Sequence, residues 1–296
     1  MPVSPYAQPS TETELRAFTQ DVLRAWVCKL EAGEIAVRIP RLRGQLRLLP
    51  DMHFHLRAEL FLQLSGKTSF EFPEEKMQVG PGEICIVPRG MPHKERVRAW
   101  RGPFFNLVFG YNRGQVIFHT ADETPRGRPR YLLRSHVQAT PCLTALLDEA
   151  GELSQSQSET RSAGLRGMMI AYFSLILAEM QGWTAPANPE PFKVTHARQL
   201  VIEQLANPKL SVAQLASQIQ CSADYLSQIF RKATGIALAG YINENRLLRA
   251  RELLELSTLN IAEVSQAAGF HDASYFTRLF RRWQGMTPRD YRRANT

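Results

Sequence analysis

The C-terminal third of the chain contains one pattern twice. The stretches Val212–Tyr241 and Ile261–Tyr291 repeat each other about 49 to 50 residues apart. Each copy predicts a short helix, a tight turn and a second helix, and each begins with a polar cap, Ser211 or Asn260, followed three residues later by Gln or Glu. This repeat restricts the region to a small all-α bundle, because short amphipathic helices must pack on one another.

The second helix of each copy, which we call the reading helix, is apolar on one side and basic at its far end. Its outward side chains suit DNA, because Arg can bind guanine and Gln can bind adenine in bidentate fashion, whereas Ser and Thr are more permissive. The predicted DNA-binding residues are Asp224, Ser227, Gln228 and Arg231 in the first copy, and Ala273, Ser274, Thr277, Arg278, Arg281 and Arg282 in the second.

The segment between the copies, Tyr241–Leu256, predicts a continuous amphipathic helix without Gly or Pro. Such a helix would span roughly 24 Å, near the scale that sets two reading helices on successive major-groove faces about 34 Å apart. Residues 192–296 carry 14 of the 36 Lys and Arg but only 8 of the 28 Asp and Glu, and thus +6 of the net charge of +8. This excess favours phosphate contacts over the alternative of a plain helical interaction domain.

The run Val194–Arg293, about a third of the chain, contains a set of short segments of one pattern: Ala267-Ala-Gly-Phe270, Ser274-Tyr-Phe276, Arg278, Phe280, Gly285, Thr287-Pro288 and Tyr291-Arg292. Through these segments the run resembles the DNA-binding region of the AraC/XylS family of bacterial transcription regulators. The resemblance implies that the protein is an activator and that bases are contacted by Asp224, Ser227 and Gln228 in the first copy and by Ala273, Ser274, Thr277 and Arg278 in the second, with Arg278 as the foremost candidate. One departure is Ala237-Leu238 in the first copy, where the second has Thr287-Pro288.

The N-terminal half changes character after an opening helix in which Leu15, Phe18, Val22 and Trp26 recur at helical spacing. Short alternating runs divided by Gly and Pro then predict a small β-barrel or sandwich. These runs are Glu34–Ile39, Gln45–Leu49, Leu60–Leu64, Ser69–Phe72, Ile84–Val87, Phe104–Phe109 and Val116–His119.

Two segments of this region resemble the two sequence motifs of the cupin fold. The first holds His53, His55 and Glu59 before Gly66, and the second holds His93 after Gly82, Pro88 and Gly90, although Val97 stands where Asn is usual. Three imidazoles and one carboxylate suit one divalent transition metal, Fe, Mn, Ni, Cu or Zn. The alternative is a metal-free pocket lined by the same residues, since the AraC/XylS resemblance implies sensor domains that often lack metal.

Two further helices are predicted over Pro141–Ser154 and Thr160–Gln181, and both are strongly apolar. They either pack on the barrel or form a homodimer interface, which a near-continuous apolar stripe favours. The proline-rich segment Gly182–Pro191 predicts a linker. The expected organisation is a cupin-like sensor domain at residues 1–138, a helical dimerisation segment at 139–181, a linker at 182–193 and a DNA-binding domain at 194–296, whose helix-turn-helix motifs occupy 212–232 and 261–282.

No apolar run reaches the ~20 residues of a membrane span, and the N-terminal segment has no signal-peptide core, so a location in the bacterial cytoplasm, associated with the nucleoid, is expected. The four cysteines form no Cys-x-x-Cys pair, which argues against a disulfide framework or a zinc finger.

The fold class predicted is therefore multidomain α+β, with an N-terminal cupin-like β-barrel and a C-terminal all-α tandem helix-turn-helix domain. The function expected is a regulator of transcription that binds promoter DNA, responds to a small molecule or metal and, as an activator, contacts RNA polymerase. An alternative is a metal-dependent dioxygenase or isomerase with an appended DNA-binding module, although no separate acid, base or nucleophile is assignable. An architectural DNA binder would leave the ligand-lined barrel unexplained.

Overall fold

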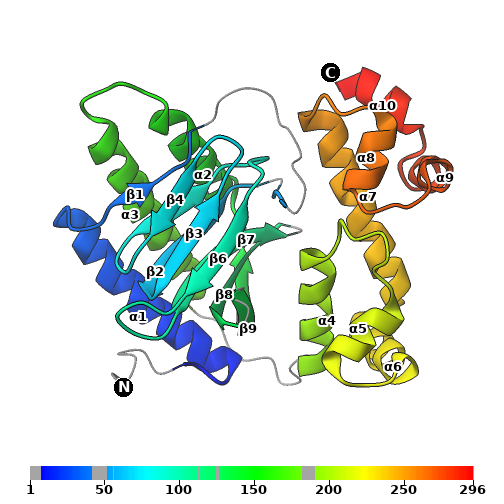
Figure 1. The fold of residues 1–296 in the computed structure, drawn as a ribbon, viewed down its shortest axis with the longest axis horizontal. Helices are drawn as coiled ribbons and strands as arrows, with labels where there is room; N and C mark the ends of the chain where they lie inside the picture. The colour runs from blue at the N-terminus through cyan, green and yellow to red at the C-terminus, as the bar shows by residue number, and fades with distance from the viewer. Residues whose placement is uncertain are drawn as a thin grey trace. The chain divides into compact units, whose positions relative to one another are not determined.

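The computed structural model describes residues 8–41, 52–55, 57–112, 114–124, 127, 129–181 and 191–295. The chain divides into two compact units, Met1–Ala185 and Pro186–Thr296. The predicted strand Gln45–Leu49 and residues 182–190 of the predicted linker lie outside the described residues. Figure 1 shows a β-rich first unit and an all-helical second unit, and the fold class predicted from the sequence is thereby confirmed.

The described residues of the first unit form two β-sheets. The larger has the order β1-β5-β2-β7-β8-β9 and is antiparallel except for the parallel pair β1–β5, and the smaller has the antiparallel order β4-β3-β6. The strands are β1 (Val37–Arg38), β2 (Glu59–Ser65), β3 (Lys67–Glu71), β4 (Lys76–Val79), β5 (Ile84–Val87), β6 (Lys94–Arg98), β7 (Phe105–Asn112), β8 (Gln115–Glu123) and β9 (Pro129–Gln138).

A buried apolar cluster fills the space between the two sheets. Phe61 of β2 and Val108 of β7 meet Phe70 of β3 and Val79 of β4 there. Burying apolar side chains of this size stabilises the fold by about 1.5–3 kcal/mol each, which holds the two sheets together as a closed barrel-like sandwich.

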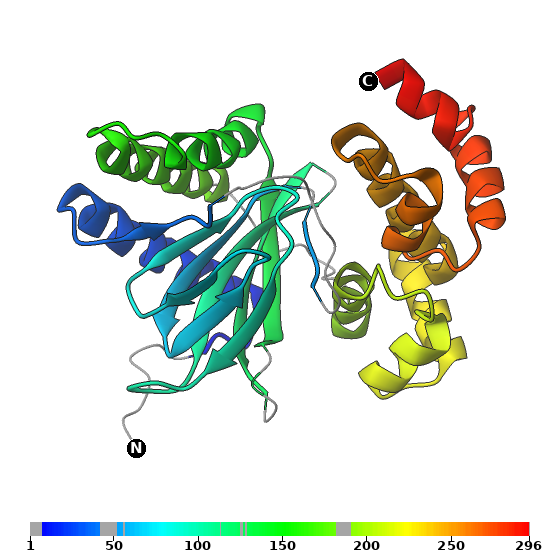
Figure 2. The same cartoon turned by 45° about the horizontal axis from the view of Figure 1, so that its top comes forward.

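Three helices cover the outer face of the larger sheet, as Figures 1 and 2 show: α1 (Glu12–Glu31), α2 (Pro141–Ser154) and α3 (Arg161–Met180). Thr11 caps α1, accepting a hydrogen bond from the backbone N–H of Glu14 at 3.2 Å. Leu23 of α1 and Phe173 of α3 are fully buried in one cluster with Leu62 and Leu107 of the sheet. This amphipathic packing explains why the opening helix was predictable from its spacing.

The helix α3 is long and apolar enough, by length and composition alone, to cross a membrane. Its inward residues Met169, Tyr172 and Ile176 are fully buried in the cluster shared with α1, α2 and the sheet. Packing of this kind is typical of a core helix in a globular unit, and it accounts for the apolar composition of one side of α3.

The second unit is all-helical. The copies of the repeat are joined by one continuous 19-residue helix of roughly 28 Å, as the sequence predicts. The helices are α4 (Phe192–Glu203), α5 (Val212–Ile219), α6 (Ala223–Thr234), α7 (Leu238–Leu256), α8 (Ile261–Ala267), α9 (Ala273–Gln284) and α10 (Pro288–Asn295). The reading helices are α6 and α9.

The second copy also contacts the loop that precedes the first copy, which the sequence did not predict. Arg246 of α7 is buried, and its guanidinium donates to the carbonyl oxygens of Leu205, at 3.4 Å, and Asn207, at 2.8 Å. Gly269, in the turn between α8 and α9, lies so close that a Cβ there would be 1.9 Å from the Leu205 oxygen. The second copy therefore packs on the loop after α4, in addition to its covalent connection through α7.

Candidate functional site

The reading helices begin in the same way in both copies. Ser222 and Asp272 are the N-caps of α6 and α9, and each side chain accepts a hydrogen bond from the backbone N–H three residues later. Gly235 and Gly285 end these helices in the left-handed conformation. Matching caps hold both helices in the same local geometry, which is what two equivalent DNA-reading elements require.

The helices that precede the reading helices differ in detail. Asn260 and Glu263 form a full capping box at α8, whereas at α5 only the cap on the Gln214 N–H from Ser211 is present. The left-handed residue of the second turn is Gly269, at φ 89°, but in the first copy it is Gln220, at φ 58°. A left-handed Gln is uncommon, and no glycine marked that position in the sequence.

The predicted DNA-binding side chains lie on the solvent side of α6 and α9. Ser227 and Thr277 occupy equivalent positions, and each hydroxyl donates to a backbone carbonyl one turn earlier, of Ala223 and Ala273 respectively, at 2.8 Å. Because the hydroxyl protons are used in this way, these two residues present a lone pair or a methyl group to a base. Exposed side chains at the other positions are Asp224, Gln228, Arg231, Ala273, Ser274, Arg278, Arg281 and Arg282.

Charge differs between the two reading helices. Asp224 near the start of α6 can accept a hydrogen bond from cytosine but repels phosphate, whereas α9 has no acidic residue and carries Arg278, Arg281 and Arg282. Within the described part of the chain none of these three arginines is in an ion pair. The second copy is therefore better prepared to bind both bases and phosphates.

Arg281→Ala or Arg282→Ala is expected to weaken binding to cognate and random duplexes by the same factor. Each removed phosphate contact lowers the slope of log Kobs against log salt concentration by about 0.9, because one fewer counterion is released. Titration of labelled duplexes at several salt concentrations measures this slope. A loss confined to the cognate duplex would show that these arginines contact bases instead.

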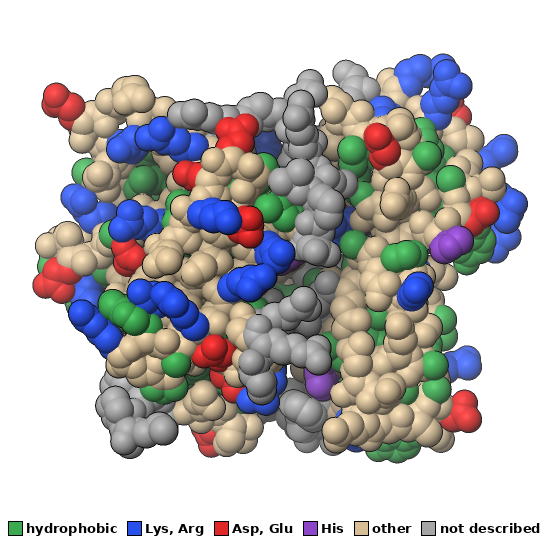
Figure 3. Space-filling view, viewed as in Figure 1, with side chains coloured by type: hydrophobic (Ala, Val, Ile, Leu, Met, Phe, Trp, Pro, Cys, Tyr) green, Lys and Arg blue, Asp and Glu red, His purple; other side chains and the backbone are tan. Residues whose placement is uncertain are grey.

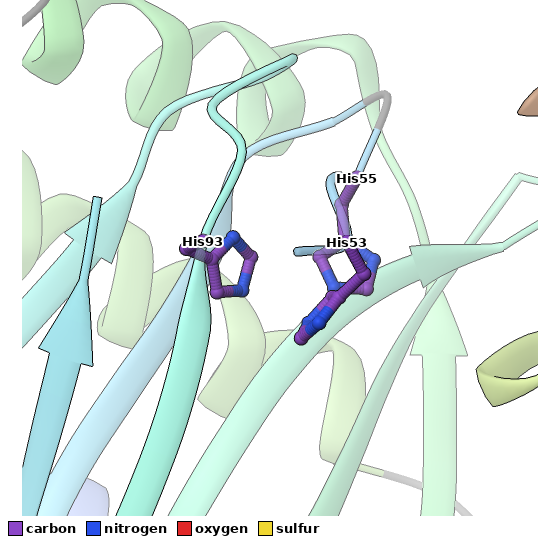
Figure 4. A group of neighbouring side chains, drawn as sticks. All are labelled: His53, His55 and His93. Atoms are coloured by element: carbon purple, nitrogen blue, oxygen red, sulfur yellow. The ribbon is translucent and has the colours of Figure 1, made fainter. Parts of the chain in front are cut away.

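A second candidate site, made of side chains that can bind a metal ion, lies at one end of the barrel interior. The ligand atoms of His53, His55 and His93 come within 4.8 Å of one another, and Figure 4 shows the three rings gathered together. The ring centroids of His53 and His93 are 4.2 Å apart. His53 lies outside the named strands and forms an isolated antiparallel bridge with His93. That bridge, rather than strand alternation, sets the two rings side by side.

Glu59 lies outside this group of three. Its Oε2 atom is 3.2 Å from Nε2 of His55, and it is the first residue of β2. Burial, together with the charge of Glu95, raises the pKa of Glu59 well above its usual range. The carboxyl group therefore contacts one histidine of the group and is placed to orient its ring.

His93 is the fully buried member of the histidine group, and its protonation state suits a metal ligand. Its Nδ1 lies 3.0 Å from the carbonyl oxygen of Met91, which can only accept, so Nδ1 carries the proton. Nε2 is then unprotonated and carries a free lone pair, and it has no hydrogen-bond partner among the described residues. Burial lowers the pKa of His93 to about 4, so the ring is neutral near pH 7, as a metal ligand must be.

A polar group deeper in the barrel was not found from the sequence. Gln63 of β2 is fully buried and hydrogen-bonds to Thr68 of β3 at 2.7 Å. Asn106 of β7 lies opposite Gln63 in the register, is 1% exposed, and neither atom of its amide has a partner among the described residues. A buried amide without partners is costly, so this position is suited to a bound water or ligand. Only the pairing of β2 with β7 reveals it.

Comparison with known families matches both units. Residues 36–169 match the family described as AraC-like ligand-binding domain, and residues 215–294 match a helix-turn-helix domain family. The first match contains the histidine group and Asn106, and the second contains both reading helices.

Individual proteins are also similar to parts of the chain. The chain is 30% identical to the transcriptional activator RhaR of Enterobacter sp. over 63% of this chain and 67% of that protein. It is 29% identical to an uncharacterized helix-turn-helix-type transcriptional regulator, YijO of Escherichia coli, over 72% and 74% respectively. A solved regulator with an AraC-type DNA-binding domain from Chromobacterium violaceum aligns with 29% identity over 35% of this chain and 92% of that chain, at a TM-score of 0.33.

Proposed function

Because the chain belongs to the AraC family of transcription regulators, we propose that it activates transcription from promoters to which both reading helices bind, in response to an effector held in the barrel. It is a DNA-binding regulator and not an enzyme, so the alternative of a dioxygenase or isomerase is set aside. Activation is proposed from its similarity to proteins named as transcriptional activators.

The observation that carries this proposal is the pair of matched reading helices, α6 and α9, in one compact unit. Their equivalent caps present equivalent outward positions, of which Gln228 and Arg278 are exposed and have the bidentate chemistry that distinguishes adenine and guanine. We assign base contacts to Asp224, Ser227, Gln228, Ala273, Ser274, Thr277 and Arg278, and phosphate contacts to Arg231, Arg281 and Arg282.

Selection from a pool of random duplexes by the full-length chain tests this function. The selected sequences should converge on two short conserved blocks about one helical turn apart, since each reading helix binds one major-groove segment. A pool that stays random after repeated selection would contradict the proposal. The result also supplies the cognate duplex for the measurements below.

We further propose that the barrel holds one divalent transition metal on His53, His55 and His93, with Glu59 orienting His55. Support comes from the neutral, unpartnered Nε2 of buried His93, which lies in the group of three rings. Three imidazole nitrogens suit Zn, Cu, Ni, Co or Fe. A metal there would offer open positions to an effector with a donor atom, while Asn106 would hydrogen-bond a polar part of it.

Protein purified without chelator or histidine tag is expected to contain near-stoichiometric metal by elemental analysis, and H53A/H93A is expected to contain none. The matched control is H196A/H271A, which removes two histidines of the second unit and should keep the metal. Zinc added to the stripped wild-type protein should raise its Tm, because a ligand that binds only the folded state stabilises it. Equal trace metal in all three proteins would end the metal proposal.

The remaining features of the function are proposed on the family's behaviour. A second copy is the proposed partner of α2 and α3, because Met168, Ile170, Leu175 and Leu177 on α3 are only partly buried in the unit. RNA polymerase is the proposed partner in activation, and the bacterial cytoplasm, on nucleoid DNA, is the proposed location. The expected boundaries, 1–138, 139–181, 182–193 and 194–296, stay our proposal for the domains.

A further inference from the structure

The outer face of the small sheet in the first unit is strongly basic. Side chains alternate along its strands, so the residues that face away from the barrel core are every second one. Among the described helices of this unit, the buried faces of α1, α2 and α3 pack with the larger sheet and leave this face uncovered. Figure 3 shows blue Lys and Arg side chains spread over it. We call Lys67, Lys76, Lys94, Arg96 and Arg98 the basic face.

The register of the strands brings like charges together on this face. Lys67 of β3 lies directly opposite Arg98 of β6, and Ser69 lies opposite Arg96. Like charges directly opposite one another destabilise a sheet. The single outward carboxylate of these strands, Glu71, is paired with Lys76 at 3.2 Å. Within the described residues neither Arg96 nor Arg98 has an ion-pair partner, so the repulsion is not relieved inside the unit.

An aromatic side chain fixes the position of two cations at the edge of this face. The ammonium group of Lys67 lies 4.1 Å from the ring centroid of Trp100, and the guanidinium of Arg101 lies 4.5 Å from it. Such cation–π contacts hold a cation at a defined place without neutralising its charge. The face therefore has a fixed arrangement of positive charge and not merely mobile side chains.

The composition of the face favours phosphate over an acidic protein as its partner. The centre of a protein–protein interface is rich in aromatic and apolar residues and poor in Lys. Among the described residues, the large hydrophobic side chains that are exposed, Tyr225, Ile236, Tyr275 and Met286, all belong to the second unit. Alternate residues of a strand are about 6.8 Å apart, close to twice the charge spacing of about 3.4 Å along one DNA strand.

We propose that the basic face is a second, sequence-independent DNA contact, at which the first unit binds the phosphate backbone of the duplex that the reading helices occupy. This inference rests on the proposed function, because DNA held by the second unit is present at high effective concentration near the first. The basic face increases the affinity for DNA and the length of DNA contacted, whereas α6 and α9 determine which bases are preferred.

The test uses the full-length triple variant K67Q/R96Q/R98Q and a random-sequence duplex long enough to reach both units. Relative to wild type, the slope of log Kobs against log salt concentration should fall by about two to three, because up to three phosphate contacts are lost. The ratio of cognate to random affinity should stay unchanged. The control, R24Q/K29Q/R161Q, removes the same charge from exposed positions on α1 and α3 and should keep the wild-type slope.

Other outcomes separate this inference from the proposed function. Equal slopes for the triple variant and wild type, or equal losses in both triple variants, would overturn the basic face as a DNA contact while leaving the reading helices untouched. If that variant instead lost binding to polyglutamate, the face would be assigned to an acidic protein. Wild-type protein that binds no duplex at all would contradict the proposed function itself.

Discussion

Gly269→Ala is expected to destabilise the second unit by on the order of 4 kcal/mol, a large part of the stability of a unit this size. Two causes combine. An alanine at φ +89° costs about 1–2 kcal/mol, and its Cβ would lie 1.9 Å from the Leu205 carbonyl oxygen, a separation that atoms cannot adopt. The loop after α4 must then move, which breaks the bonds from Arg246 and leaves a buried guanidinium without them.

Hydrogen exchange of the backbone amides in α7, α8 and α9 measures this loss, because it reports the free energy of opening of each helix within the full-length chain. The matched control is Gly285→Ala. Its φ is +82°, but a Cβ there meets no described atom within 4 Å, so only the backbone cost of about 1–2 kcal/mol is expected. Equal losses in the two variants would mean that the contact of Gly269 with Leu205 does not stabilise the unit.

Arg278→Ala is expected to weaken binding to the cognate duplex by about 1–3 kcal/mol and to leave binding to random duplexes nearly unchanged. The reason is that Arg278 is exposed on the outward side of α9, and in the base contact that we propose its guanidinium contributes discrimination in addition to charge. Competition binding with cognate and random duplexes measures the ratio of the two affinities. Base preference should relax at one position of the cognate sequence.

Arg289→Ala serves as the control for this variant. Arg289 is an exposed arginine of the same unit in α10, outside the reading helices, so its removal changes the net charge equally. The affinity ratio should stay at the wild-type value in Arg289→Ala and fall in Arg278→Ala. A ratio that Arg278→Ala leaves unchanged would remove this residue from the set of base contacts.

Most helices of the fold, although not α4 and α10, were predicted from the sequence because their signals are local. The helix Pro141–Ser154 has the bounds expected from its sequence, with Thr140 as N-cap and proline at its first position. The reading helices likewise start at polar caps, Ser222 and Asp272. A cap or a proline acts within one turn of helix, so one sequence is enough to place it.

Three strands were missed, and their residues explain why. Four of the five residues of β6, Lys94–Arg98, are charged, which is atypical of strands. This segment is a strand because it pairs with β3. The strands β4 and β9 were also absent from the expected runs. These elements are fixed by neighbours distant in the sequence.

The residues of the candidate sites were likewise predictable only where their sequence signals are local. The exposed positions of α6 and α9 follow from helical periodicity, whereas the neighbourhood of His53 and His93 depends on a bridge between segments 40 residues apart in the numbering. The unpartnered amide of Asn106 and the packing of Gly269 on Leu205 have no local signal at all, since each depends on an element that is distant in the sequence. Tertiary contacts of this kind are not visible in one sequence.

The central claim is that α6 and α9 bind two neighbouring major-groove segments of one duplex. Methylation interference on the selected cognate duplex, with wild type, Gln228→Ala and Arg278→Ala of the full-length chain, tests it most directly. The account predicts two interference segments about one helical turn, or 10 base pairs, apart, the first weakened in Gln228→Ala and the second in Arg278→Ala. A single segment, or two segments that respond equally to both substitutions, would contradict it.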